Sequence, residues 1–304
     1  MTNKKISRKS VNRSFKTIGL ILIVYVLLVL YIPTLLKALF FDMDTNSKFL
    51  IFNKDSLFNM LLVILGTLLP FLLLKKAFIS KRESRAEITF KEIFIQSLLL
   101  FTVSSISLFL TSTIGSYFGR SADLVGGIGV VVNKMVVDDI VYTLLFIIIT
   151  PILEEIAFRG ILLNYLSRYG KGFALIASSI IFAFAHSSFI EIFPAFILSY
   201  ELGKIYLRYK SAKPCIWMHV IYNLFLFLLF VIPGKFSIWA AVILVIIYVS
   251  SFIALFAQKY TYIRVKNAPT TGRMIKMFFT CPTILICLLL MIVQTALTIL
   301  LNIN

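Results

Sequence analysis

The stretch Pro151-Ile-Leu-Glu-Glu-Ile-Ala-Phe-Arg-Gly160 places two adjacent carboxylates at the end of an apolar run. A charged side chain inside a bilayer costs about 2.5 to 3.5 kcal/mol on insertion scales, so it is usually paired or faces a polar cavity. On a helix, Glu155 and Arg159 are four residues apart and share one face, whereas Glu154 points about 100° away. The spacing predicts an ion pair between Glu155 and Arg159 and leaves Glu154 as the candidate reactive group.

Two further polar motifs lie downstream of this stretch. The chain has two histidines, and each occurs in an apolar segment of helix length: His186 follows Phe182 by four residues, and His219 precedes Asn223 by four. Residues four apart share one helical face, so His219 and Asn223 can line the same pocket. A single histidine or asparagine on a membrane helix more often bonds a neighbouring helix. Together with the two glutamates, these residues predict one shared polar site.

The composition is that of a membrane protein. Hydrophobic residues make up 60% of the 304 residues and the mean hydropathy is +0.98, which excludes an ordinary soluble domain. Runs of about 20 apolar residues are long enough to cross a bilayer. The sequence predicts an all-α fold, a polytopic transmembrane helical bundle of about eight or nine membrane helices. The predicted spans are 17–39, 57–74, 93–118, 140–158, 173–188, 192–207, 214–232, 236–257 and 278–301.

The positive charge of the chain indicates its orientation. The formal net charge is +17, yet the basic residues concentrate in short segments between apolar runs, which is typical of a topology signal and not of nucleic-acid binding. With the N-terminus in the cytoplasm, 24 of the 30 lysines and arginines fall on the cytoplasmic side. We therefore expect a multi-pass protein of a cell membrane, with a bacterial source favoured, whose partner is the lipid bilayer and not nucleic acid.

The predicted spans place the polar motifs at different depths. The two glutamates fall near the cytoplasmic end of the fourth span and His186 near the outer end of the fifth. A break at Pro151, or a fifth segment too short to cross fully, would bring them together. Gly160 is expected to end the helix that carries the glutamates, and residues 161–169 to form a separate interfacial helix.

The three motifs together resemble a known family. They read E-E-x-x-x-R, F-x-x-x-H and H-x-x-x-N, in this order. This pattern resembles the CPBP family (CAAX protease and bacteriocin-processing, or Abi), which includes the type II CAAX prenyl endopeptidases. The resemblance spans about residues 139–233 and implies a catalytic core there. The N-terminal basic tail with three flanking helices (1–138) and the C-terminal helices (234–304) lie outside it.

The resemblance implies an intramembrane endopeptidase that hydrolyses a peptide bond in a membrane-associated peptide or protein. In the family, the glutamate and histidine that match Glu154 and His186 activate water, and the residues that match His219 and Asn223 form the oxyanion hole. Their chemistry fits these roles, since a carboxylate can act as general base and the imidazole and amide can donate hydrogen bonds. No cofactor or metal is expected. Glu155, Arg159 and Phe182 are then supporting residues.

Alternatives remain open at this stage. Glu154, His186 and His219 also supply the two histidines and one glutamate of a catalytic zinc site, which predicts a zinc-dependent protease. A non-catalytic membrane protein that binds a partner, such as an immunity or regulatory protein, could keep the same residues as a polar core. Intramembrane glutamate and histidine also mark proton-coupled transporters, but no inverted repeat supports that interpretation.

Overall fold

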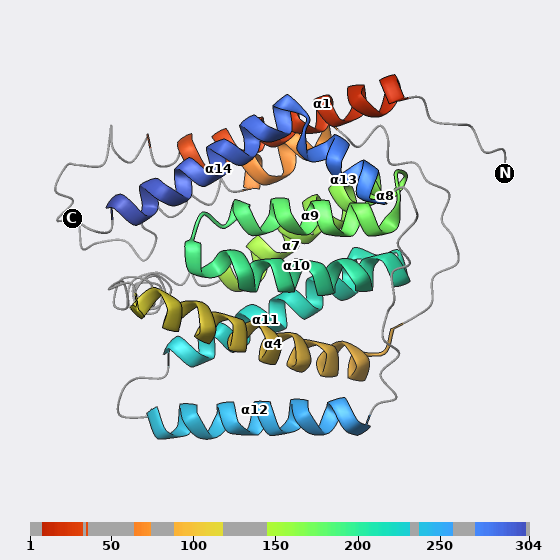
Figure 1. Cartoon of the computed structure of the whole chain (residues 1–304). Helices are drawn as coiled ribbons and strands as arrows, with labels where there is room; N and C mark the ends of the chain where they lie inside the picture. Colours follow the sequence, from red (N-terminus) through yellow and green to blue (C-terminus); the bar gives the residue numbers. More distant parts are fainter. Residues whose placement is uncertain are drawn as a thin grey trace.

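The computed structural model describes residues 8–32, 35, 64–73, 88–117, 145–231, 237–257 and 271–301. Within these ranges the regular secondary structure is helical throughout and no strand occurs (Figure 1). The predicted all-α class is therefore confirmed for the part of the chain that the structure describes. The domain boundaries at 138 and 233 stay predictions.

Most described helices coincide with the predicted apolar segments. In chain order they are α1 (Arg8–Val26), the π-helix η1 (Leu27–Tyr31), α4 (Phe90–Tyr117), η3 (Leu145–Ile149), α7 (Thr150–Glu154), η4 (Glu155–Leu163), α8 (Asn164–Ser167), α9 (Lys171–Ala185), α10 (Phe189–Tyr209), α11 (Ala212–Val231), α12 (Ser237–Ala257), α13 (Thr271–Phe279) and α14 (Pro282–Leu301). Residues 64–72 are also helical.

The described helices can be tested for the length and composition that a membrane crossing requires. Two described helices, Arg8–Tyr31 and Phe90–Thr111, meet both the length and the composition expected of a span. The pair Thr271–Phe279 and Pro282–Leu297, bent by 69°, could supply a third. The apolar helices agree with a membrane bundle, while eight or nine crossings and a cytoplasmic N-terminus stay predictions.

The helices stack in successive layers with α9 and α10 at the centre (Figure 1). The pair α1 and α14 lies on the α9 side of this centre, whereas α4 and α11 lie on the α10 side and α12 packs on the outer face of α4. The chain reverses between α9 and α10 at Ser187, and between α10 and α11 at Lys210, both in the left-handed region with φ of 52° and 53°. The motif-bearing helices therefore lie together in the middle of the stack.

Aromatic rings join the N- and C-terminal helices to this centre. Phe15 of α1 is fully buried, and its ring lies 5.2 Å from Tyr169, 5.6 Å from Phe173 and 5.1 Å from Phe278. These rings come from α1, the turn before α9, α9 itself and α13. Burial of several aromatic side chains is among the largest sources of packing energy, so the flanking helices form one packed unit with the centre.

Two local predictions are corrected by the structure. Gly160 does not end a helix, because the helical backbone continues through η4 into α8 as far as Ser167. The expected interfacial helix at 161–169 is instead largely buried, with Ile161, Leu162 and Leu163 in the core. Burial of this apolar face outweighs the weak tendency of a single glycine to terminate a helix.

Candidate functional site

The segment that carries the glutamates changes helical geometry at these residues. The short helix α7 begins at Thr150, with Pro151 in its first turn, where a missing backbone N–H is tolerated. It lies between the π-helices η3 and η4. Glu154 is the last residue of α7 and Glu155 the first of η4. Single π-helical turns often occur at functional sites, and here the change of pitch falls between the two carboxylates.

Glu155 forms the closed, inner end of the site. Its side chain is fully buried, and its Oε1 lies 2.7 Å from Nη1 of Arg159, itself 1% exposed. The predicted ion pair is therefore confirmed. The same carboxylate oxygen accepts a hydrogen bond from Nδ1 of His219 at 2.9 Å, a contact between residues 64 positions apart in the chain. A charge buried this deeply needs such partners to be tolerated.

His219 lies between the two carboxylates. Because a carboxylate only accepts, the contact with Glu155 assigns the proton to Nδ1 and turns Nε2 toward the other glutamate. The distance from Nε2 to Oε2 of Glu154 is 3.8 Å, which is too long for a hydrogen bond. The Glu154 side chain is 17% exposed, while that of Glu155 is 0% exposed. Glu154 is thus the carboxylate that keeps room for another group.

Phe182, four residues before His186, contacts both histidines and Arg159. Its backbone carbonyl accepts a hydrogen bond from Nδ1 of His186 at 2.9 Å, which leaves Nε2 of that ring uncommitted. Its own ring lies 4.7 Å from the His186 ring and 6.2 Å from the His219 ring, and the Arg159 guanidinium carbon lies 4.5 Å from its centroid. One buried side chain therefore orients both histidines and the arginine.

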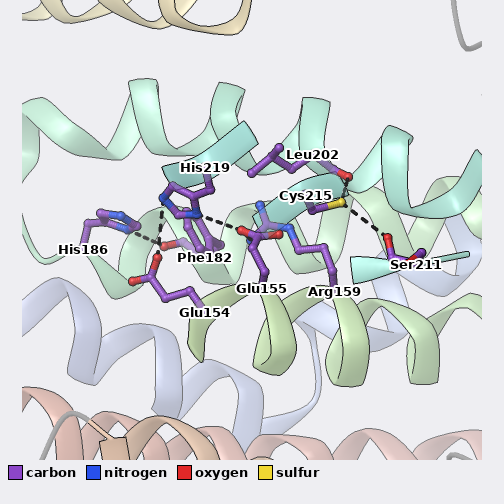
Figure 2. Close-up of polar contacts among 9 residues, drawn as sticks. All are labelled: Glu154, Glu155, Arg159, Phe182, His186, Leu202, Ser211, Cys215 and His219. Carbon is purple, nitrogen blue, oxygen red and sulfur yellow. Dashed lines mark hydrogen bonds and ion pairs between the residues drawn. The ribbon is translucent and has the colours of Figure 1, made fainter. Parts of the chain in front are cut away.

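The result is a line of polar groups drawn from three separate parts of the chain. Figure 2 shows His186, Glu154, His219, Glu155 and Arg159 following one another along the helices. Asn223 lies four residues beyond His219 on α11 and is buried, 6% exposed. The motifs meet in the middle of the helix stack, where α9 is only 15 residues long and the helical geometry changes between Glu154 and Glu155.

Some neighbours of the site carry no recognisable sequence signal. Glu191 of α10 interacts electrostatically with both His186 and Glu154, although in sequence it only interrupts an apolar run. The contact of His219 with Glu155 was not predicted either, since nothing in the sequence relates a residue on one helix to a partner 64 positions away.

The metal hypothesis has mixed geometric support. Both histidines donate through Nδ1 and leave Nε2 available, the arrangement in which second-shell groups orient zinc ligands. However, the described residues contain no group of three His, Cys, Asp or Glu side chains arranged to hold a metal ion. The expectation of a metal-independent site stays a prediction.

The middle of the chain matches one known family model. Residues 136–225 match the family model described as Rce1-like, type II CAAX prenyl endopeptidase. The predicted resemblance is thus confirmed over a segment that contains all three motifs. The Rce1-like match indicates a protease, and together with the long apolar helices it indicates a membrane protein. No curated protein and no solved structure matches the chain.

Proposed function

We propose that the protein is an intramembrane endopeptidase in which Glu154, assisted by His186, activates a water molecule for peptide-bond hydrolysis. The observation that carries the proposal is the contrast between the two adjacent carboxylates. Glu155 is paired with Arg159 and His219 at 2.7 and 2.9 Å, whereas Glu154 is partly exposed and lies 3.8 Å from Nε2 of His219. A general base must be reachable by the proton that it removes.

The reaction consumes one water molecule. Glu154 takes a proton from the water while the oxygen forms a bond to the carbonyl carbon of the substrate. Nε2 of His186 is free to accept a second hydrogen bond from the same water, because Nδ1 is held by the Phe182 carbonyl. When the carbon–nitrogen bond breaks, Glu154 returns its proton to the leaving amine. The products are one carboxylic acid and one amine, which exchange a proton to become a carboxylate and an ammonium group.

The negative charge on the carbonyl oxygen requires hydrogen-bond donors. His219 can donate through Nε2 only if its ring carries both protons, since Nδ1 already donates to Glu155. Asn223 lies one helical turn away and carries an amide that can serve as the second donor. Loss of one such donor reduces turnover by about 10² to 10³ in other hydrolases. Glu155 and Arg159 act by holding His219 in place.

A zinc-dependent mechanism is the second candidate. It is favoured by the two available Nε2 atoms and would use Glu154, His186 and His219 as ligands. We rank it second because the described residues lack a three-ligand cluster with metal spacing. Partner binding without catalysis is a third candidate, in which the same contacts only stabilise the fold.

One experiment can both identify the substrate and distinguish a protease from a non-catalytic, partner-binding protein. Membrane peptides from cells that produce the wild-type protein are compared by mass spectrometry with those from cells that produce Glu154→Gln. A protease yields cleaved peptides that disappear in the variant, and the uncleaved precursor accumulates. Glu92→Gln is the matched control, since Glu92 lies in the exposed first turn of α4, where it caps the helix with Thr89. Identical peptide sets for wild type and Glu154→Gln would reject proteolysis by this mechanism.

A further inference from the structure

Three segments from distant parts of the chain meet at one end of the helix stack. They are the first turns of α1, the link between α8 and α9, and the short helix α13 (Figure 1). The ring of Phe15 joins them, since it lies 5.2 Å from the ring of Tyr169 and 5.1 Å from that of Phe278. The rings of Phe173 and Phe278 are 5.6 Å apart. This buried aromatic packing fixes the three segments relative to one another.

The exposed charges on these three segments are all positive. No aspartate or glutamate occurs in 8–26, 164–173 or 271–279. Lysine or arginine side chains are exposed at eight positions, here called the basic surface: Arg8, Lys9, Arg13, Lys16, Arg168, Lys171, Arg273 and Lys276. Charges of one sign that are not interspersed with the other sign create a potential that attracts an oppositely charged partner. The basic surface therefore fits an anionic partner.

Helix α13 indicates where the basic surface lies relative to the bilayer. Helix α14 has 20 residues, about 30 Å of helix, which matches the hydrocarbon thickness without any contribution from α13. Large apolar side chains such as Leu285 and Leu289 are exposed on α14, as expected beside lipid. The axis of α13 is bent by 69° from that of α14. A short helix at this angle, with Phe278 buried and two cations exposed, is typical of the headgroup region.

We propose that the basic surface binds the headgroups of anionic phospholipids. An arginine can donate two parallel hydrogen bonds to a phosphate, and a lysine supplies a point charge. Each lysine or arginine close to an anionic leaflet strengthens binding about fivefold. Through the contacts of Phe15 and Phe278 with Phe173, the bound headgroups set the depth of α9, whose last residue precedes His186. The flanking helices outside the Rce1-like segment thereby hold the central helices at a fixed level in the membrane.

The test removes three charges of the basic surface and leaves the packing beneath them intact. The variant combines Lys16→Gln, Arg273→Gln and Lys276→Gln. The Lys16 carbonyl, which accepts a hydrogen bond from the Thr283 hydroxyl at 3.1 Å, is retained. Purified protein in detergent is titrated with phosphatidylglycerol, and native mass spectrometry gives the fraction of protein that carries lipid. The apparent Kd should rise about 100-fold in the triple variant and about fivefold in each single variant.

A matched control removes the same charge from the other side of the stack. Lys91, Arg208 and Lys213 are exposed on α4, α10 and α11, at the same end of the bundle but on the α10 side (Figure 1). Their combined replacement by glutamine should leave the apparent Kd close to that of the wild type. Equal loss of affinity in the two triple variants would overturn the proposal, because total charge and not the basic surface would then determine lipid binding.

A second control tests charge separately from folding. Lys16→Arg, Arg273→Lys and Lys276→Arg together keep the three charges, so this variant should bind phosphatidylglycerol as the wild type does. Loss of binding in this variant, with an unchanged size-exclusion profile, would overturn the proposal. Equal affinity of the wild type for phosphatidylcholine, or displacement of the lipid by inorganic phosphate, would also overturn it. None of these measurements needs a substrate, and their outcome is therefore independent of the proposed proteolysis.

Discussion

Glu154 and Glu155 are neighbours in the chain with opposite surroundings. Glu155 is fully buried and held on one side by Arg159 and on the other by His219, at 2.7 and 2.9 Å. Glu154 is partly exposed, and among the described residues its ion-pair contact is with Nε2 of the same histidine, at 3.8 Å. Both contacts of Glu155 are made through Oε1 in the buried interior, whereas the carboxylate of Glu154 is 17% exposed. In the proposed mechanism, the buried Glu155 therefore has a positioning role and the partly exposed Glu154 is the general base.

The largest expected effect comes from removing the open carboxylate. Glu154→Gln keeps the shape of the side chain and removes the base, so kcat should fall by about 10⁴-fold, the upper end of general-base contributions. Purified protein is assayed on the identified peptide, with folded protein measured by size-exclusion profile. Thermal unfolding should stay close to that of the wild type, because this carboxylate makes no close ion pair. Wild-type cleavage by this variant would contradict the assignment.

Substitution of the buried Glu155 should mainly lower the stability of the protein. Glu155→Gln leaves Arg159 buried without its charge partner, which costs about 3 to 5 kcal/mol in comparable pairs. We expect a lower unfolding temperature and less folded protein in the membrane, with partial activity in the fraction that folds. The double variant Glu155→Gln with Arg159→Met removes both charges and should recover part of the stability. If Glu155→Gln were fully stable but inactive, the general base would be Glu155 and not Glu154.

The effect of Asn223→Ala should be smaller and purely kinetic. If the amide donates to the oxyanion, kcat falls about 10² to 10³-fold while KM changes little, since that bond strengthens mainly in the transition state. Steady-state kinetics on the same peptide separate the two constants. An increase in KM at constant kcat would instead place Asn223 in substrate binding.

Chelation should have the smallest effect. Because Glu154 and His186 can activate water without a cation, activity should persist in the presence of a chelator, and purified protein should carry no stoichiometric zinc. Metal content is measured on wild type and on His186→Ala and His219→Ala. Activity that is lost on chelation and restored by zinc, with metal absent from both variants, would establish the zinc mechanism.

Sequence reasoning named the candidate residues and one contact among them, the Glu155–Arg159 ion pair. The Glu155–Arg159 pair could be predicted because both residues lie on one helix, where a spacing of four is enough. The helical continuation through Gly160 was missed, since a glycine weakens a helix only slightly and packing against other helices overrides it. The π-helical geometry of η4 has no reliable sequence signal. The directions of the Glu154 and Glu155 side chains relative to each other could therefore not be predicted from the sequence.

The sequence by itself determined the all-helical class, the membrane character and the residues that form the polar site, because periodicity, hydropathy and residue chemistry are local properties. Only the tertiary structure decided which glutamate His219 bonds, that the Phe182 ring contacts both histidines, and that Tyr25 packs against Phe158. These contacts join residues far apart in the chain. They depend on how α1, α9 and α11 pack around the glutamates, and the free energy of that packing is shared among many side chains.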